Sequence, residues 1–233
     1  MLHQFRTWPT VSGFRSPLLS GDRVCAVVPE ATVGILRVVD RVSVPWRNGV
    51  GVTSEIVVSP SPGDFDWRLS IATVDSDAPF STFVGVDRCL LALSEQGLEL
   101  IDEGRVVRLG AFESHHFAGE DEVASNRVTR PTLDLNLMTR RGRCSGTLES
   151  HRVTGSWSIT AAPEESIVVV IVLGSFMLGS SAHGAEPLAM LDAIRLDGIE
   201  TASAAVTLTA GSLTTVTLTG VGQIVVARVV CAA

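Results

Sequence analysis

The sequence contains no tyrosine and no lysine, so all 18 of its Lys+Arg residues are arginines. No phenol group is therefore available for proton transfer or covalent catalysis. The formal net charge is -7, and a chain with this balance has no electrostatic footprint for nucleic acid. We interpret the exclusive use of arginine as a coding bias, because it extends over the whole chain and is not confined to one segment.

The four cysteines are isolated from one another, and no C-x-x-C pair occurs. The sequence therefore offers no zinc-ribbon or dithiol redox motif. Four cysteines in 233 residues also argue against a disulfide framework and favour a reducing compartment. We expect Cys25, Cys89, Cys144 and Cys231 each to be a small buried hydrophobic residue.

No apolar run is long enough to cross a bilayer. The most apolar segment extends from Ser166 to Gly179, is shorter than the roughly 20 residues of a spanning helix, and is interrupted by Gly174 and Ser175. We predict two buried strands joined by a turn at this place. Residues 1–31 lack the continuous apolar core of a secretory signal. We interpret them as a poorly ordered or misassigned leader and expect a cytoplasmic protein.

Apolar and polar residues alternate with a period of two over much of the chain, whereas helical periodicity is scarce. Turn signals such as PSPGD at 60–64 and DEG at 102–104 separate the predicted strands. This pattern favours an antiparallel sandwich or barrel. The same order of strands and turns recurs in the two halves. We therefore divide the chain into a first β-unit, 32–142, which carries the polar site, and a second β-unit, 143–233.

Two predicted strands carry polar side chains on one face. In the stretch DFDWRLSIATV these are Arg68 and Ser70, and in LDLNLMTRR they are Asp134, Asn136 and Arg140. Such a face either meets water, as in an ordinary sandwich, or lines the inside of a barrel. If it points inward, the arginines need a negative partner, which is a carboxylate of the protein or of a ligand.

Four stretches occur in a fixed order: PWRNGVGVTSEI, DFDWRLSIATV, PFSTFVGVDRCLLAL and DLNLMTRRG. Together they resemble the HutD/Ves family, closely over 33–142 and by pattern over the remainder. The resemblance implies an all-β, double-cupin (bicupin) fold of two antiparallel β-barrel or jelly-roll units. It also implies a protein that binds formylglutamate-type intermediates and limits histidine utilisation, while Ves is linked to cold stress. This chain departs from the family in the run Gly49-Val50-Gly51, where a valine between the glycines would narrow a site.

We predict a ligand site in the first unit, in which Arg68 anchors a carboxylate because guanidinium binds that group through two parallel hydrogen bonds. The amide and hydroxyl groups would orient the rest of the ligand. We interpret Trp46 and Trp67 as core aromatics, and the adjacent Asp87 and Arg88 as an ion pair or strand-end cap. The predicted site residues are Asn48, Glu55, Arg68, Ser70, Asn136 and Arg140.

The histidines do not form the metal-binding set of many cupins, because His115 and His116 are adjacent while His151 and His183 are isolated. No G-x-S-x-G nucleophile motif occurs. We therefore predict no metal, no cofactor and no catalytic residue. The expected partner is a small carboxylate metabolite rather than nucleic acid or a membrane, and a homodimer is an open option. Two alternatives also stay open: a metal-independent cupin enzyme acting on a small acid, and a stress-associated interaction protein without a ligand.

Overall fold

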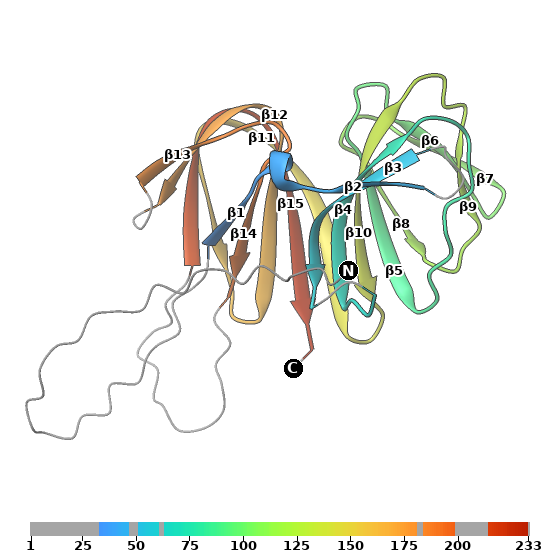
Figure 1. Ribbon diagram of the computed structural model, residues 1–233, viewed down its shortest axis with the longest axis horizontal. Coiled ribbons are helices and arrows are strands. Elements are labelled where there is room, and N and C mark those ends of the chain that lie inside the picture. The colour runs from blue at the N-terminus through green and yellow to red at the C-terminus, as the bar shows by residue number, and fades with distance from the viewer. Residues whose placement is uncertain (1–32, 47–50, 61–62, 181–183, 199–213, 233) are drawn as a thin grey trace, which may run out of the picture.

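The computed structural model describes residues 33–46, 51–60, 63–180, 184–198 and 214–232, and strands dominate it (Figure 1). Within these ranges the helical content is one short 3-10 segment, η1 (Val38–Asp40), so no described helix has the length or the apolar character needed to cross a membrane. The strands are β1 (Val33–Leu36), β2 (Ser43–Pro45), β3 (Gly51–Ser59), β4 (Trp67–Val74), β5 (Val86–Ala92), β6 (Leu98–Asp102), β7 (Arg105–Leu109), β8 (Ser114–Ala118), β9 (Val123–Asn126), β10 (Thr132–Arg140), β11 (Cys144–Ala161), β12 (Glu165–Ser180), β13 (Gly184–Leu188), β14 (Ala193–Asp197) and β15 (Thr214–Cys231).

The strands form three antiparallel sheets. The first sheet has the order β2-β3-β4-β10-β5-β8, and a small sheet, β7-β6-β9, lies on the same side of the molecule (Figure 1). The second sheet has the order β1-β14-β12-β15-β11, with β13 added to β12. β1 falls within the predicted first unit, 32–142, but pairs with β14 of the second sheet. The division of the chain at 142/143 coincides with the turn between β10 and β11, and it stays a prediction.

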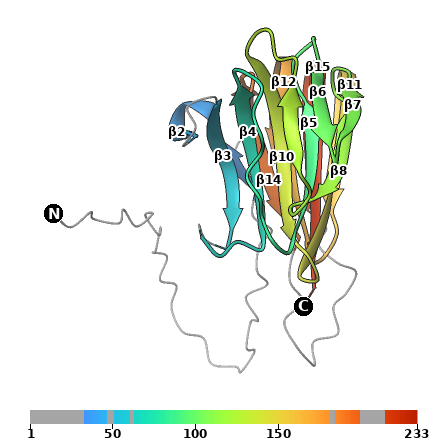
Figure 2. The ribbon, with the colours of Figure 1, turned by 90° about the vertical axis from the view of Figure 1, so that its right-hand side faces the viewer.

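The first and second sheets share one hydrophobic core, and Figure 2 looks onto the first sheet with the second sheet behind it. Odd-numbered residues of β4 and β10 face this shared core, because successive side chains of a strand point to opposite faces. Its members from the first sheet include Trp67, Leu69, Ile71, Leu135 and Leu137, and those from the second sheet include Leu148, Val168, Val170, Val225 and Ala227.

Each side of the molecule has a further core of its own. One lies within the second sheet and contains Ile171, Leu178 and Ile224. The other joins the first sheet to the small sheet and contains Leu90 and Leu100. The predicted all-β fold is therefore confirmed.

Ser166 to Gly179 form one continuous strand, so the prediction of two strands joined by a turn is wrong. Gly174, which we interpreted as a turn residue, lies opposite Gly222 of β15 within the sheet. Its φ is +93°, and the register of β12 shifts by one residue between Ile171 and Leu173. A glycine with positive φ beside a bulge bends a strand without ending it.

We expect Gly174→Ala to destabilise the fold by about 2 kcal/mol or more, because the backbone conformation and the space both oppose a side chain. A Cβ atom at this position would lie 2.0 Å from the carbonyl oxygen of Val221. Gly142→Ala is the matched control, since Gly142 also has a positive φ, +79°, but open space around it. Urea unfolding of both variants measures the difference; equal losses would contradict the close approach of the two strands.

The cysteine prediction is corrected in one respect. Cys144 and Cys231 face each other across β11 and β15 and form a disulfide, whereas we expected four reduced thiols. They are 87 residues apart in the sequence, so only the pairing of the two long strands brings them together. Cys89 is a buried free cysteine, as predicted. Cys25 lies outside the described residues.

Candidate functional site

The polar faces of β4 and β10 line a cavity of about 570 Å³ in the first unit. Even-numbered residues of both strands point into it because the odd-numbered ones are directed to the shared core. Asn136 lies opposite Ser70 on β4 and opposite Leu90 on β5, so these three neighbouring side chains form one row of the cavity lining. The polar side chains of the two strands therefore line a cavity and do not form an outer solvated face.

A loop and the entry to β3 complete the cavity. Phe80, Ser81 and Phe83 line it from the segment before β5, and Trp46 lines it from the end of β2. The indole Nε1–H of Trp46 donates a hydrogen bond of 2.7 Å to Thr53 Oγ1. Its ring meets Phe80 edge-on, with 6.2 Å between the ring centroids. Trp46 is thus part of the cavity wall, whereas Trp67 is buried in the shared core as predicted.

Four of the six predicted site residues come together in this cavity, namely Glu55, Arg68, Ser70 and Asn136. Arg140 does not line it, because it lies at the end of β10, where its Nε–H donates to the carbonyl of Phe65 (3.3 Å) and its guanidinium contacts Asp64 (3.4 Å). Asn48 lies outside the described residues.

Arg68 and Glu55 form an ion pair at the rim, with 3.6 Å between Nη1 and Oε1. The side chain of Glu55 is 42% exposed and that of Arg68 is 22% exposed, so solvent screens the pair and it contributes little to stability. Within the described residues, the buried Nε of Arg68 has no hydrogen-bond partner. Arg68 thus lines the cavity with one donor that lacks a partner among these residues.

Arg88 is the positive group that sequence reasoning missed. It is 6% exposed and its guanidinium carbon lies 4.7 Å from the ring centroid of Phe117, with Phe80 and Phe83 within 6 Å. Burial lowers the pKa of Arg88 to about 10, although Asp134 acts to raise it. Its Nη1 donates to the carbonyl of Ser81 (3.2 Å), while its Nε has no partner among the residues that the structure describes.

Asp134 is the buried negative group of the cavity lining and is 1% exposed. Burial raises the pKa of Asp134 to about 7, against the opposing effect of the Arg88 charge. In the described part of the chain, Asp134 Oδ1 and the nearby Asn136 Oδ1 accept no hydrogen bond. Buried polar atoms in native proteins nearly always have a partner in the protein or in ordered water, so bound water or a ligand with several polar groups would satisfy these four atoms of one cavity.

The alternation of β5 could have indicated that Arg88 points away from the shared core. Arg88 and Leu90 occupy even positions of β5, and Cys89 and Leu91 occupy odd positions facing the shared core. Only the pairing of β5 with β10, which places Arg88 opposite Met138 on the other side from Arg68, shows that the two arginines belong to one site.

The adjacent histidines lie on opposite faces of β8 and outside the cavity lining. His115 Nε2 is 2.7 Å from Asp102 Oδ2, and His116 Nε2 is 3.3 Å from Cys89 Sγ. Burial raises the pKa of the Cys89 thiol to about 11, so this thiol is not an activated nucleophile. Across the described ranges, no three His, Cys, Asp or Glu side chains gather as a metal-binding group.

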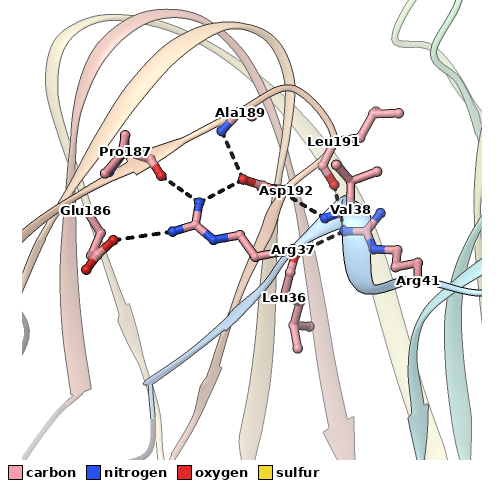
Figure 3. Close-up of polar contacts among 9 residues, drawn as sticks. All are labelled: Leu36, Arg37, Val38, Arg41, Glu186, Pro187, Ala189, Leu191 and Asp192. Atoms are coloured by element: carbon pink, nitrogen blue, oxygen red, sulfur yellow. Dashed lines mark hydrogen bonds and ion pairs between the residues drawn. The ribbon is translucent and has the colours of Figure 1, made fainter.

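The second unit has a pocket of about 580 Å³, which Arg37 borders together with Met177, Pro187 and Thr219. The guanidinium of Arg37 is held by the protein (Figure 3): its Nη1 donates to Asp192 Oδ2 at 2.9 Å and to the carbonyl of Pro187 at 2.6 Å. These contacts join the residue that follows β1 to β13 and to the turn between β13 and β14.

Asp192 is the centre of that cluster (Figure 3). Burial alone would raise the pKa of Asp192, but hydrogen bonds from the backbone N–H groups of Val38 (2.8 Å) and Ala189 (3.0 Å), together with Arg37, hold it below its ordinary value. The Asp192 carboxylate is satisfied from within the protein, so its role is structural.

Comparisons with known proteins agree with this architecture. The HutD family model matches residues 39–214. An uncharacterized 21.2 kDa protein in the hutC 3' region of Pseudomonas putida is 32% identical over 168 residues, which cover 70% of this chain and 86% of that protein. Protein Ves of Citrobacter koseri is 34% identical over 139 residues, covering 58% of this chain and 70% of Ves.

Two solved structures extend the comparison. HutD from Pseudomonas fluorescens SBW25, in a formate condition, is 25% identical, with a TM-score of 0.70 over 87% of this chain and 100% of that chain. A Cupin 2 conserved barrel domain protein from Leptotrichia buccalis is 7% identical and has a TM-score of 0.50 over 78% of this chain and 89% of that chain; it shows the fold alone. The family match and the shared fold lead to one conclusion: the chain belongs to the HutD/Ves family and has a cupin fold.

Proposed function

We propose that the chain binds a small carboxylated metabolite in the first cavity and thereby regulates or limits histidine utilisation. The observation that carries this proposal is the pair of arginines, Arg68 and Arg88, which both line the cavity and each have a buried Nε–H without a hydrogen-bond partner among the described residues. A ligand carboxylate would satisfy these donors through charge-assisted hydrogen bonds. We propose a ligand of the formylglutamate type, which is the class that the HutD resemblance implies.

Two further observations support this proposal. The Pseudomonas putida relative is named for its position in the hutC 3' region, which fits a role in histidine utilisation. The solved HutD was obtained in a formate condition, and formate is a carboxylate. A cytoplasmic location is also our proposal. The disulfide between Cys144 and Cys231 does not support this location, since disulfides are rare in reducing compartments.

We expect Arg68→Ala to weaken binding of N-formyl-L-glutamate by roughly 10- to 100-fold, since a hydrogen bond to a charged group contributes about 1.5–3 kcal/mol. Isothermal titration calorimetry of the purified chain measures the change. Arg140→Ala is the matched control. It also removes a guanidinium from this face of the sheet, but from β10 and outside the cavity lining. Unchanged affinity in Arg68→Ala would contradict the proposed site.

One observation favours a second candidate, a metal-independent enzyme acting on a small acid. Asp134 is a buried cavity carboxyl whose pKa of about 7 suits a general acid or base at neutral pH. Hydrolysis of N-formyl-L-glutamate by chelator-treated protein, lost in Asp134→Asn, would support the enzyme. Binding without turnover would support the metabolite-binding protein.

A further inference from the structure

We propose that Asp134 makes the first cavity selective for carboxylates that also carry an N–H donor, such as N-acylamino acids, over carboxylates that lack one. This inference rests on the proposed function and assigns to Asp134 the role of a specificity-determining residue. The alternation of its strand placed Asp134 on the polar face, and within the described residues its Oδ1 accepts no hydrogen bond.

The four unpartnered atoms divide into two complementary pairs. Arg68 Nε and Arg88 Nε are donors, and Asp134 Oδ1 and Asn136 Oδ1 are acceptors; none has a partner among the described residues. A simple carboxylate satisfies the donors but brings further oxygens toward the two acceptors. A ligand that places an N–H group beside its carboxylate satisfies both donors and the acceptor of Asp134, and leaving a buried polar group unpaired is what a binding site penalises most strongly.

Asp134 carries this selectivity more than Asn136 does. The side-chain amide of Asn136 can turn and present either its oxygen or its NH₂ group to a ligand. The ionised carboxylate of Asp134 only accepts hydrogen bonds, and it repels a ligand oxygen placed against it. Because Asp134 is 1% exposed, water cannot easily screen this repulsion.

The charges of the cavity lining support the same ligand class. The charged members of the described lining are Glu55 on β3, Arg68 on β4, Arg88 on β5 and Asp134 on β10, whereas the loop residues Pro79, Phe80, Ser81 and Phe83 are uncharged. With Asp134 ionised these charges sum to zero, and the cavity presents a positive and a negative end. Such a site matches a ligand with a carboxylate at one end and the positive side of an N–H dipole at the other.

Selectivity should depend on pH, because the carboxyl of Asp134 titrates near neutrality. Its pKa is raised to about 7 by burial, with Arg88 opposing the rise. Well above this value Asp134 is ionised and requires a donor from the ligand. Well below it Asp134 is protonated and its O–H can donate to a ligand oxygen, so the advantage of an N–H group shrinks.

The test compares two probes that differ in one atom. N-formyl-L-glutamate has an N–H group where 2-(formyloxy)glutarate has an ester oxygen. Titrations followed by tryptophan fluorescence, with freshly dissolved ester, are suitable because Trp46 lies in the cavity wall. We expect the amide to bind roughly 30-fold tighter than the ester at pH 8.5, and less than about fivefold tighter at pH 5.5.

Two variants complete the experiment. In Asp134→Asn the preference for the amide should become small and equal at both pH values. In Asp66→Asn, which removes an acid outside the cavity lining, the preference and its pH dependence should stay as in the unaltered chain. The comparison of the two probes at two pH values requires no variant, so the inference remains testable if Asp134→Asn fails to fold.

The outcomes separate the two proposals. Equal affinity of both probes for the unaltered protein at pH 8.5 would overturn the role of Asp134 while leaving carboxylate binding intact. A preference that is the same at pH 5.5 and pH 8.5 would also overturn it. Binding of neither probe at any pH would contradict the proposed function itself.

Discussion

The free energy of unfolding of Asp134→Asn should vary much less between pH 4 and pH 7 than that of the unaltered protein. The carboxyl of Asp134 has a folded-state pKa raised to about 7 by burial, whereas an unfolded aspartate titrates at about 3.9. The folded state therefore holds this proton over a pH range in which the unfolded state has released it. Stability from this group is complete below pH 4 and falls as the pH rises to about 7.

The expected size is on the order of 4 kcal/mol over the whole window, because each pKa unit corresponds to about 1.4 kcal/mol. Asparagine cannot ionise, so the variant gains stability relative to the unaltered protein as the pH rises from 4 to 8. Loss of the Asp134 charge also removes a partner from Arg88, but Arg88 stays charged in this window because its pKa is about 10. The attraction between Arg88 and ionised Asp134 develops with this same titration and is already part of the Asp134 pKa of about 7, so it adds no separate slope.

Urea unfolding at closely spaced pH values measures the difference between the two proteins. Asp66→Asn is the control, because Asp66 lies outside the cavity lining and its partly exposed ion pair with Arg143 contributes little to stability; its curve should run parallel to that of the unaltered chain. Parallel curves for Asp134→Asn as well would mean that the buried carboxyl does not hold its proton near pH 7.

Leu137→Ala should destabilise the fold by about 3–4 kcal/mol, as expected for a leucine truncated in a rigid core. Leu137 is 1% exposed and lies in the core that the first and second sheets share. Because both sheets lose contacts at once, we expect one cooperative unfolding transition that moves as a whole, although the chain has two predicted units.

Calorimetry and urea unfolding followed by circular dichroism check this expectation. Leu100→Ala is the matched control, because Leu100 is equally buried but belongs to the core between the first sheet and the small sheet. If the two units fold independently, Leu137→Ala will give two separated transitions, and the single-transition prediction will be wrong.

Alternation in the sequence was sufficient to predict the faces of β4 and β10. The side chains of Arg68, Ser70 and Asn136 follow from the period of two alone, and the structure places all three in one cavity. Strand continuity was not predictable in the same way. Gly174 in β12 and Gly222 in β15 resemble turn residues locally, and only their mutual pairing shows that both strands continue through the bend.

The remaining features of the site depend on contacts between distant segments. Arg88 enters the cavity because β5 pairs with β10, and Phe80 covers it because the loop before β5 folds back, with Pro79 bridging to Ala124. The disulfide between Cys144 and Cys231 likewise needs the pairing of β11 with β15. Single-sequence patterns describe one strand at a time and contain no direct information on such neighbours.

β10 has a consequence for how this protein can diverge during evolution. Its odd positions, Leu135 and Leu137, serve the shared core, and its even positions, Asp134, Asn136 and Met138, serve the cavity. Mutations at even positions can therefore change what is bound without removing contacts from the shared core, whereas mutations at odd positions weaken that core directly. New ligand preferences among descendants of this chain should accordingly arise by changes at every second residue of one strand.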